Sequence, residues 1–136
     1  MFTIISNLKT ANNVLLARIN KLKKAGYNIS LHKHPLYEQY TIDKITIKSK
    51  RKTKQRFVLS SGLHGVEGYV GHAAIHSFLN TLLETINDYT EVVIFPTLNP
   101  YGMDTHQRTN INNVDLNRNF SKNDFSSENN KYLIVK

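Results

Sequence analysis

Apolar residues near the start of the chain recur every three or four positions. This period predicts one amphipathic helix over residues 6–26, because residues so spaced share one helix face. Arg18 is a polar interruption on that face, and Ala25-Gly26 supplies a stop signal. The apolar positions that define the face are Leu8, Ala11, Val14, Leu15, Ile19 and Leu22.

Three later segments carry strand patterns. They follow a stretch from Tyr27 to Tyr40, punctuated by Pro35, that we expect to be a loop. Thr41 to Lys48 alternates apolar and polar residues imperfectly, as a half-buried or edge strand does. Arg56 to Ser61 holds a short apolar run that is typical of an internal strand. Glu91 to Pro96 is a second buried strand, closed by its proline.

A second helical pattern, over residues 67–83, separates the last two of these strands. Two strands joined through such a helix form a right-handed crossover and pair in parallel. The chain is therefore predicted to be a single α/β domain over residues 1–136, with ligands at the carboxyl ends of its strands. From Thr97 to Phe120 it is irregular and rich in asparagine, and residues 121–136 form an irregular tail.

The composition restricts the classes of function. A chain of 136 residues with 40% hydrophobic residues is large enough for one core. It contains no cysteine, so a metal ion would have to bind His, Asp or Glu side chains. No apolar run is long enough to cross a membrane, and the N-terminus lacks a secretory leader. These features favour a soluble, cytoplasmic protein without a membrane partner.

The formal net charge of +8 raises the question of nucleic-acid binding. Much of the excess lies from Lys48 to Arg56, between two strand-like segments. We interpret this stretch as a solvated hairpin turn whose charges keep a sheet edge soluble. A phosphate-contacting loop is the alternative, but the stretch has no interleaved aromatic residues and matches no nucleic-acid-binding module. A nucleic-acid partner is therefore not expected.

A first polar cluster follows the strand predicted at residues 56–61. His64 and Glu67 lie three residues apart at the junction between this strand and the helix, so both side chains can point into one space above the sheet edge. An imidazole nitrogen and a carboxylate oxygen are suitable zinc ligands. Taken alone, such a pair is more often a chance pairing on a turn than a metal site.

A second polar cluster follows the strand predicted at residues 91–96. It contains Asn117-Arg118, and a guanidinium beside an amide can bind a substrate carboxylate through paired hydrogen bonds. Arg108 could stabilise the negative charge that develops on a carbonyl oxygen under attack. A polar loop with Asx turns and structural arginine contacts explains this segment alone equally well.

Four motifs follow one another between residues 57 and 120, with an apolar strand before each cluster. They are Gly-Leu-His-Gly-Val-Glu-Gly, Asn-Pro-Tyr-Gly, Arg-x-Asn and Asn-Val-Asp-Leu-Asn-Arg-Asn-Phe. In this order they resemble the zinc carboxypeptidase superfamily (peptidase family M14), and most of all its branch DUF2817, a domain of unknown function. The resemblance implies a partial carboxypeptidase-like α/β fold, with a mixed sheet and flanking helices, that is truncated on its C-terminal side.

The resemblance also assigns a metal site. It implies that His64 and Glu67 are the first two ligands of a Zn²⁺ ion and that Asp115 orients the ring of His64. Family members place a third ligand, a histidine, and a catalytic glutamate well beyond the Asn-Arg pair. This chain has no histidine after His106, and its one later glutamate, Glu128, lies in the tail and is assigned no role. The zinc site is therefore predicted to be incomplete.

For the substrate, the resemblance implies that Arg108 polarises the carbonyl group under attack. It implies that Asn117 and Arg118 bind a free carboxylate. The expected substrate is a peptide or a small amino-acid derivative with such a group.

A truncated or split zinc metallopeptidase-like hydrolase, inactive alone, is the leading interpretation. A second polypeptide could carry the missing half. The alternatives are a fragment of an N-acyl amino acid deacylase of the aspartoacylase and succinylglutamate desuccinylase type, and a non-catalytic remnant. An incomplete sheet would also expose an unpaired strand edge and apolar surface, near Phe95 and at Tyr132–Val135.

The remaining histidines are interpreted as follows. His72 and His76 lie four residues apart on the predicted helix and could form a metal pair, but the resemblance gives them no such role, so we expect packing or surface positions. His32 and His34 are expected to be exposed. His106 is a candidate substitute for the missing ligand.

Overall fold

The computed structural model describes residue 5, residues 7–37 and residues 39–119. Its first element is helix α1 (Leu8–Lys24), which confirms the helix predicted over residues 6–26. The side-chain oxygen of Asn7 accepts a hydrogen bond from the backbone N–H of Thr10 at 3.0 Å and caps the first turn. After the helix, Gly26 adopts a φ of 96°, which glycine reaches without steric cost.

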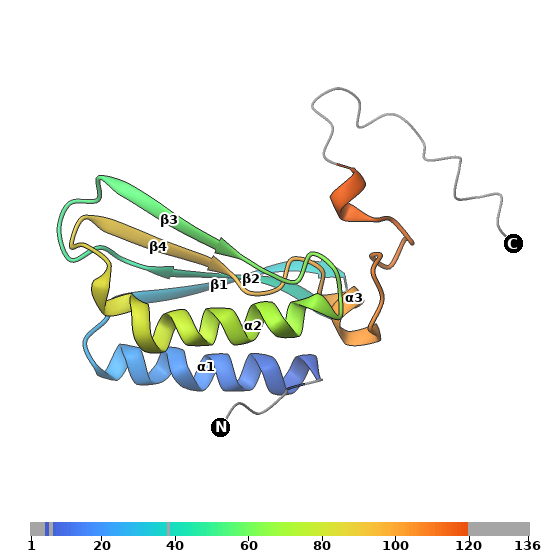
Figure 1. The fold of residues 1–136 in the computed structure, drawn as a ribbon, viewed down its shortest axis with the longest axis horizontal. Coiled ribbons are helices and arrows are strands. Elements are labelled where there is room, and N and C mark those ends of the chain that lie inside the picture. Colours follow the sequence, from blue (N-terminus) through green and yellow to red (C-terminus); the bar gives the residue numbers. More distant parts are fainter. Residues whose placement is uncertain (1–4, 6, 38, 120–136) are drawn as a thin grey trace, which may run out of the picture.

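Four strands form one mixed sheet in the order β1-β2-β4-β3 (Figure 1). β1 (Ile29–Tyr37) and β2 (Tyr40–Ile47) form an antiparallel hairpin. β2 also pairs antiparallel with β4 (Thr90–Phe95). β3 (Gln55–Ser60) pairs in parallel with β4, which confirms the predicted parallel pair.

The prediction of a loop from Tyr27 to Tyr40 is wrong, because β1 occupies most of this segment. The side chains from Ser30 to Leu36 are almost all exposed, so β1 has no buried period that could mark it in the sequence. Pro35 is tolerated there because β1 is an edge strand. His32 and His34 are exposed on it, as expected.

β2 is half-buried, one of the two possibilities predicted for it, and it is an internal strand. The internal position predicted for β3 is wrong, because β3 lies at the edge of the described sheet. β4 separates the two strands, so the basic stretch between them is not a hairpin turn. The outer strands of the described sheet are β1 and β3, and β3 is the strand that pairs beside Phe95. Tyr132–Val135 lies outside the described residues.

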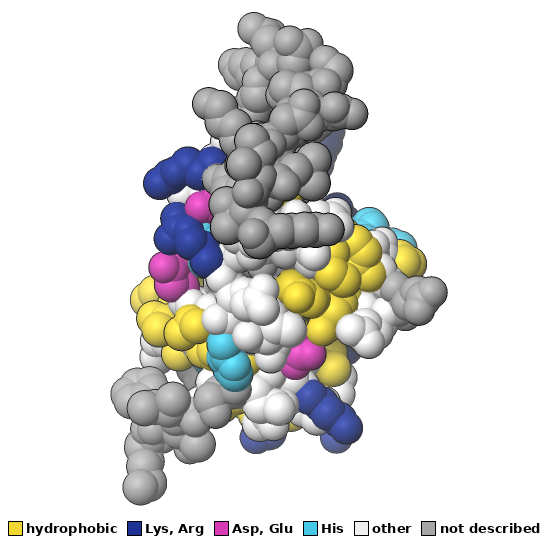
Figure 2. Space-filling view, turned by 90° about the vertical axis from the view of Figure 1, so that its right-hand side faces the viewer, with side chains coloured by type: hydrophobic (Ala, Val, Ile, Leu, Met, Phe, Trp, Pro, Cys, Tyr) yellow, Lys and Arg dark blue, Asp and Glu magenta, His cyan; other side chains and the backbone are white. Residues whose placement is uncertain are grey.

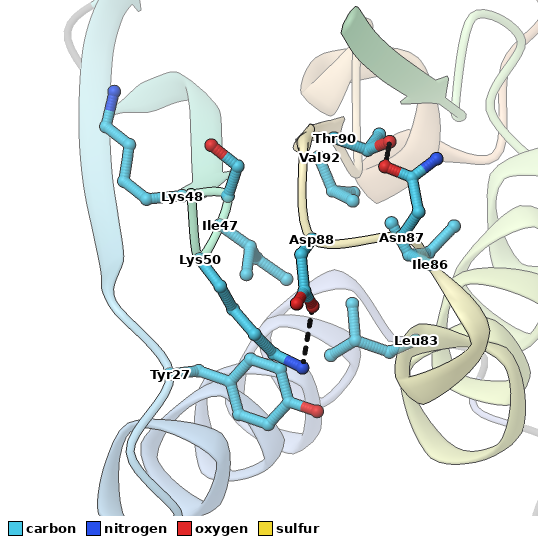
Figure 3. Close-up of a pocket in the computed structure, with 11 residues that line it drawn as sticks. Tyr27, Ile47, Lys48, Lys50, Leu83, Ile86, Asn87, Asp88, Thr90 and Val92 are labelled. Carbon is cyan, nitrogen blue, oxygen red and sulfur yellow. Dashed lines mark hydrogen bonds and ion pairs between the residues drawn. The ribbon is translucent and has the colours of Figure 1, made fainter. Parts of the chain in front are cut away.

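Part of the basic stretch pairs with acidic side chains of the fold. Lys48 Nζ and Arg56 Nη2 each lie 2.8 Å from the carboxylate of Glu91, whose side chain is 5% exposed. The hydrogen bond from Lys48, and after it that from Arg56, lowers the pKa of Glu91. Lys50 forms an ion pair with Asp88 at 3.2 Å beside a small cavity (Figure 3). These cations therefore neutralise carboxylates near the start of β4.

Helix α2 (Glu67–Ser77) connects β3 to β4. It continues as a π-helical turn (η1, Phe78–Leu82) and a 3-10 turn (η2, Leu83–Thr85), which together match the helix predicted over residues 67–83. α1 and α2 lie side by side on one face of the sheet (Figure 1). The main core between the helices and the sheet includes Leu15, Ile19, Ile45, Ile75, Leu79, Val92 and Ile94.

The segment predicted to be irregular contains two short helical elements. α3 (Pro100–Thr105) begins at the Asn-Pro pair, and the 3-10 turn η3 (Leu116–Arg118) follows Asp115. A second, smaller core packs α3 against α1 and β2 and consists of Leu8, Ala11, Tyr40 and Met103. It anchors the part of the chain that carries the second polar cluster. None of the helices in the described ranges is long and apolar enough to span a membrane.

Candidate metal centre

Both polar clusters lie at the same end of the sheet, where β3 and β4 end (Figure 1). The segments that follow these strands are joined by backbone hydrogen bonds. The N–H of Leu98 donates to the oxygen of Ser61 at 2.9 Å, and the N–H of Asn99 donates to the oxygen of Gly62 at 2.7 Å. Figure 2 faces this end of the molecule and shows acidic and basic side chains next to one another.

Asn99 connects three segments around the site. Its side chain is buried, and its Oδ1 accepts a hydrogen bond from the N–H of Gly102 at 3.0 Å, which caps α3. Its amide nitrogen donates to the backbone oxygens of Thr109 at 3.1 Å and Leu63 at 3.4 Å. This role was not predicted. The sequence signal for it is the Asn-Pro pair, a capping residue followed by proline at the first helical position.

We expect Asn99→Ala to lower the free energy of unfolding by about 2 kcal/mol, because the buried N–H of Gly102 and the partly buried backbone oxygens of Leu63 and Thr109 lose their partner. Urea denaturation followed by circular dichroism measures the change. Asn20→Ala, at an exposed position of α1, is the control and should change it by less than about 0.5 kcal/mol. Equal stability of the two variants would contradict the role of Asn99.

Gly65 permits the closest approach between the two loops. Its N–H donates to the backbone oxygen of Gln107 at 3.0 Å. A Cβ atom at this position would collide with the backbone oxygens of Gly102 and Gln107. The glycine after His64 is therefore required by a contact between backbones, and this contact brings the second cluster to the first.

His64 lies between two carboxylates. Its Nδ1 is 3.1 Å from Glu67 Oε2, and its Nε2 is 3.2 Å from Asp115 Oδ1. The side chains of His64 and Asp115 are 11% and 13% exposed, whereas that of Glu67 is 75% exposed. The fold thus brings together residues from the two clusters that are 51 positions apart in the sequence.

These contacts fit a bound cation. A neutral imidazole carries one N–H, yet a carboxylate oxygen lies next to each of its nitrogens. If Nε2 carries the proton and donates a hydrogen bond to Asp115, the lone pair of Nδ1 faces the carboxylate of Glu67. A cation bound by both Nδ1 and this carboxylate would relieve their repulsion. Two zinc bonds of about 2.1 Å at a tetrahedral angle separate their ligand atoms by about 3.4 Å, close to the observed 3.1 Å.

Asp115 also contacts the predicted catalytic arginine. Its Oδ2 accepts a hydrogen bond from Arg108 Nε at 2.8 Å, and its Oδ1 accepts one from the N–H of Asn117 at 2.9 Å. The bond from Arg108 is the main reason that the pKa of Asp115 falls from 3.8 to about 2, and His64 and the N–H of Asn117 contribute. Asp115 is therefore ionised at neutral pH and can contact Arg108 and His64 at the same time.

Asn117 and Arg118 form part of η3, directly after Asp115. Both residues are exposed. Asp115 caps this turn, so the carboxylate that contacts His64 also fixes the backbone that carries the predicted substrate clamp. The clamp residues are thus next in the chain to a residue of the candidate metal centre.

Within the described residues, no three His, Asp or Glu side chains are arranged to hold a metal ion together. Asp115 cannot join Glu67 on one ion, since the two contact opposite nitrogens of the His64 ring. His106 packs its ring 5.8 Å from that of Tyr69. His72 is buried, with Nε2 2.8 Å from Thr97 Oγ1, which confirms its packing role.

Comparison with known families identifies the chain. The family model of DUF2817, described as a protein of unknown function, matches residues 15–136. The chain belongs to the DUF2817 family. No curated protein matches its sequence.

Solved structures show what this DUF2817 fold is similar to. A "putative metallopeptidase" from Shewanella amazonensis superposes with a TM-score of 0.66 at 15% identity, covering 81% of this chain and 39% of that one. Another, from Shewanella denitrificans, has a TM-score of 0.65 at 20% identity with the same coverage. A succinylglutamate desuccinylase/aspartoacylase from Rhodobacter sphaeroides has a TM-score of 0.50 at 21% identity, covering 69% and 30%.

These likenesses confirm the predicted fold class, a mixed α/β sheet of the metallopeptidase type. The DUF2817 chain spans about two fifths of the length of the two Shewanella proteins, since the alignments cover 39% of each. Identities of 15% and 20% show the fold alone, so the roles of the site residues are proposals.

Proposed function

We propose that this DUF2817 protein is the metal-binding part of a zinc hydrolase of the carboxypeptidase type. One observation supports this most directly: the ring of His64 has Glu67 at one nitrogen and Asp115 at the other. A ligand pair in which the second ring nitrogen is held by a carboxylate is the usual arrangement of a zinc-bound histidine.

His64 Nδ1 and Glu67 would hold Zn²⁺, which when bound supplies a Lewis acid and an activated water. Asp115 keeps the ring of His64 in its orientation. The guanidinium of Arg108, half exposed and fixed through Nε by Asp115, would stabilise negative charge on a substrate carbonyl oxygen.

Asn117 and Arg118 would bind the free carboxylate of a peptide or a small amino-acid derivative. A planar guanidinium pairs with a carboxylate through two hydrogen bonds, and an amide adds a further donor. Their place on η3 after Asp115 supports this role, because a clamp there would lie beside the metal ligand.

The described residues supply neither a third ligand nor an assigned general base. Catalytic zinc sites use three protein ligands and a water. We therefore expect the 136-residue chain to have little or no hydrolytic activity by itself. A non-catalytic remnant would also be inactive by itself. The two interpretations differ in one respect: a remnant would stay inactive with every added polypeptide, whereas a split hydrolase would become active with the polypeptide that completes its site.

An N-acyl amino acid deacylase is the second candidate. The structural likeness to the Rhodobacter sphaeroides succinylglutamate desuccinylase/aspartoacylase favours it. The two candidates differ in the bond that is cleaved, so a completed site that hydrolyses N-acyl amino acids and spares C-terminal peptide bonds would favour the deacylase.

Metal binding tests the proposal directly. We expect the chain to bind one Zn²⁺ ion, and His64→Ala or Glu67→Gln to weaken the binding at least tenfold, because each removes one of the two proposed ligands. Isothermal titration calorimetry with zinc at pH 7.5 measures the dissociation constant.

His34→Ala, an exposed histidine on β1, is the control for adventitious binding and should leave the affinity unchanged. If all four proteins bind zinc equally well, or none binds it, the proposed centre does not exist.

A further inference from the structure

The end of the molecule opposite the candidate metal centre carries nine of the 18 Lys and Arg residues of the protein. They come from the last turn of α1, from the loop between β2 and β3, and from the start of β3, which lie at the left of Figure 1. All nine residues are exposed. We call this surface the basic end, and it consists of Lys21, Lys23, Lys24, Lys48, Lys50, Arg51, Lys52, Lys54 and Arg56.

Backbone hydrogen bonds fix the segments of the basic end to one another. The residues that follow α1 are joined to the end of β2, since the N–H of Lys48 donates to the oxygen of Asn28 at 2.9 Å. The loop between β2 and β3 is joined to the turn before β4, since the N–H of Arg51 donates to the oxygen of Asp88 at 2.9 Å. The cations are therefore parts of one surface, although α1 and the loop are far apart in the sequence.

Few carboxylates balance the charge of the basic end. The acidic residues at the same end of the molecule are Glu84, Asp88 and Glu91, so nine cations face three carboxylates. Four of the cations share Asp88 and Glu91 through ion pairs. In the described part of the chain, no carboxylate pairs with the other five, which are Lys21, Lys23, Lys24, Lys52 and Lys54. Like charges gathered on one surface repel one another, so the basic end favours a negatively charged partner.

An aromatic ring lies among these cations. The ring of Tyr89, in the turn before β4, has Lys54 Nζ at 4.4 Å and Arg51 Cζ at 5.8 Å from its centroid. Cations at such distances are attracted to the face of the ring, which holds them in place before a partner arrives and lowers the entropy cost of binding. The basic stretch has no aromatic residue of its own, and the sequence analysis expected no nucleic-acid partner partly for that reason. The fold supplies the missing ring from another part of the chain.

The chemistry of the basic end fits a nucleic acid better than a lipid surface. Lysine and arginine side chains that contact phosphates release the counterions condensed on a nucleic acid, and this release drives binding. The binding of a protein to an anionic membrane also grows with the apolar area that it inserts. Residues 20–28 and 48–56, all of which the structure describes, contain no exposed large hydrophobic side chain.

We propose that the basic end binds the phosphate backbone of a nucleic acid strand without reading its sequence. Most of its cations are lysines, whose ammonium groups act as point charges and contact phosphates beside any base. The strand would contact the last turn of α1 and the loop between β2 and β3 together. Because the basic end lies opposite the candidate metal centre, the strand would not cover His64.

Fluorescence anisotropy of the full chain with a labelled single-stranded RNA of about 20 uridines tests this proposal. We expect the dissociation constant to rise at least about tenfold between about 50 mM and 200 mM salt, because counterion release drives binding less at higher salt. Lys52→Gln combined with Lys54→Gln should raise the dissociation constant at about 100 mM salt at least about fivefold. The slope of its logarithm against the logarithm of the salt concentration should fall by about 1.4, or about 0.7 for each lost phosphate contact. Lys23→Gln combined with Lys24→Gln should have the same effects, because both segments contact one strand.

Lys9→Gln combined with Lys33→Gln is the matched control, since it removes the same charge at exposed positions away from the basic end. It should change the dissociation constant by less than about twofold at this salt concentration, because charges more than about 10 Å away are screened. Circular dichroism verifies that each variant folds.

Three results would overturn the proposal. They are no binding of the RNA at about 50 mM salt, basic-end variants that lose no more affinity than the control, and binding to phosphatidylserine vesicles by a chain that does not bind the RNA. The last would assign the basic end to a lipid surface. His64→Ala should bind the RNA as the unmodified chain does, so a failure of this proposal is distinguishable from a failure of the zinc centre.

Discussion

Gly65→Ala is expected to lower the free energy of unfolding by about 3 kcal/mol or more, or to prevent folding. The new Cβ would meet the backbone oxygens of Gly102 and Gln107, which cannot rotate away as a side chain would. The loops around His64 and Arg108 would have to separate. The hydrogen bond from the N–H of Gly65 to the oxygen of Gln107 would then be lost.

Urea denaturation of the two proteins measures this effect, and Gly26→Ala provides a matched control. An added Cβ at Gly26 would meet no atom within 4 Å, but the residue has a φ of 96°. Its substitution should therefore cost about 1 kcal/mol for backbone conformation alone. A Gly65 variant that is as stable as the Gly26 variant would show that the loops are not in contact at this point.

Acidification from pH 7 to pH 4 is expected to lower the free energy of unfolding by about 3 kcal/mol through His72. Burial, with a smaller contribution from nearby His76, lowers the pKa of His72 from 6.5 to about 4. Between these values the unfolded chain binds a proton that the folded chain excludes. The contribution of His72 is thus complete above pH 6.5, falls as the pH decreases, and is lost below about pH 4.

The measurement is the free energy of unfolding at several pH values for the unmodified chain and for His72→Gln. Between pH 7 and pH 4 the free energy of unfolding of the variant should fall by about 3 kcal/mol less than that of the unmodified chain, because glutamine does not titrate. His34→Gln, on the exposed side of β1, should behave like the unmodified chain. Identical pH dependence for all three proteins would contradict the effect of burial. The stability that depends on ionised Asp115 is lost at lower pH, between about pH 3.8 and pH 2, and does not affect this measurement.

The elements that the sequence marks most clearly are α1 and β4, which have many buried apolar residues. In α1 the spacing of Leu15, Ile19 and Leu22 corresponds to a face that packs on the sheet. β4 is buried along almost its whole length, and its apolar run indicates this. β1 has no such pattern, because it is held by backbone pairing to β2 while its side chains face solvent. Strand pairing of that kind leaves no mark in the pattern of hydrophobic residues.

The candidate site was predictable in its residues and not in its geometry. His64 and Glu67 are close in the sequence, so their proximity follows from one turn. The contact between His64 and Asp115 depends on Gly65 and Asn99, which join loops from different strands. Periodicity says nothing about such loop-to-loop contacts. β3 shows the converse, since its apolar run indicates a strand with two neighbours and the described sheet supplies one.

The two oxygens of Asp115 have different partners, His64 on Oδ1 and Arg108 on Oδ2. A single carboxylate thereby couples the orientation of the proposed metal ligand to that of the arginine proposed to face the substrate. A substitution of Asp115 would therefore change the orientation of both His64 and Arg108. In proteins with this arrangement, we expect substrate preference to change through residues that the side chain of Asp115 does not contact. The exposed Arg118 is the first such position.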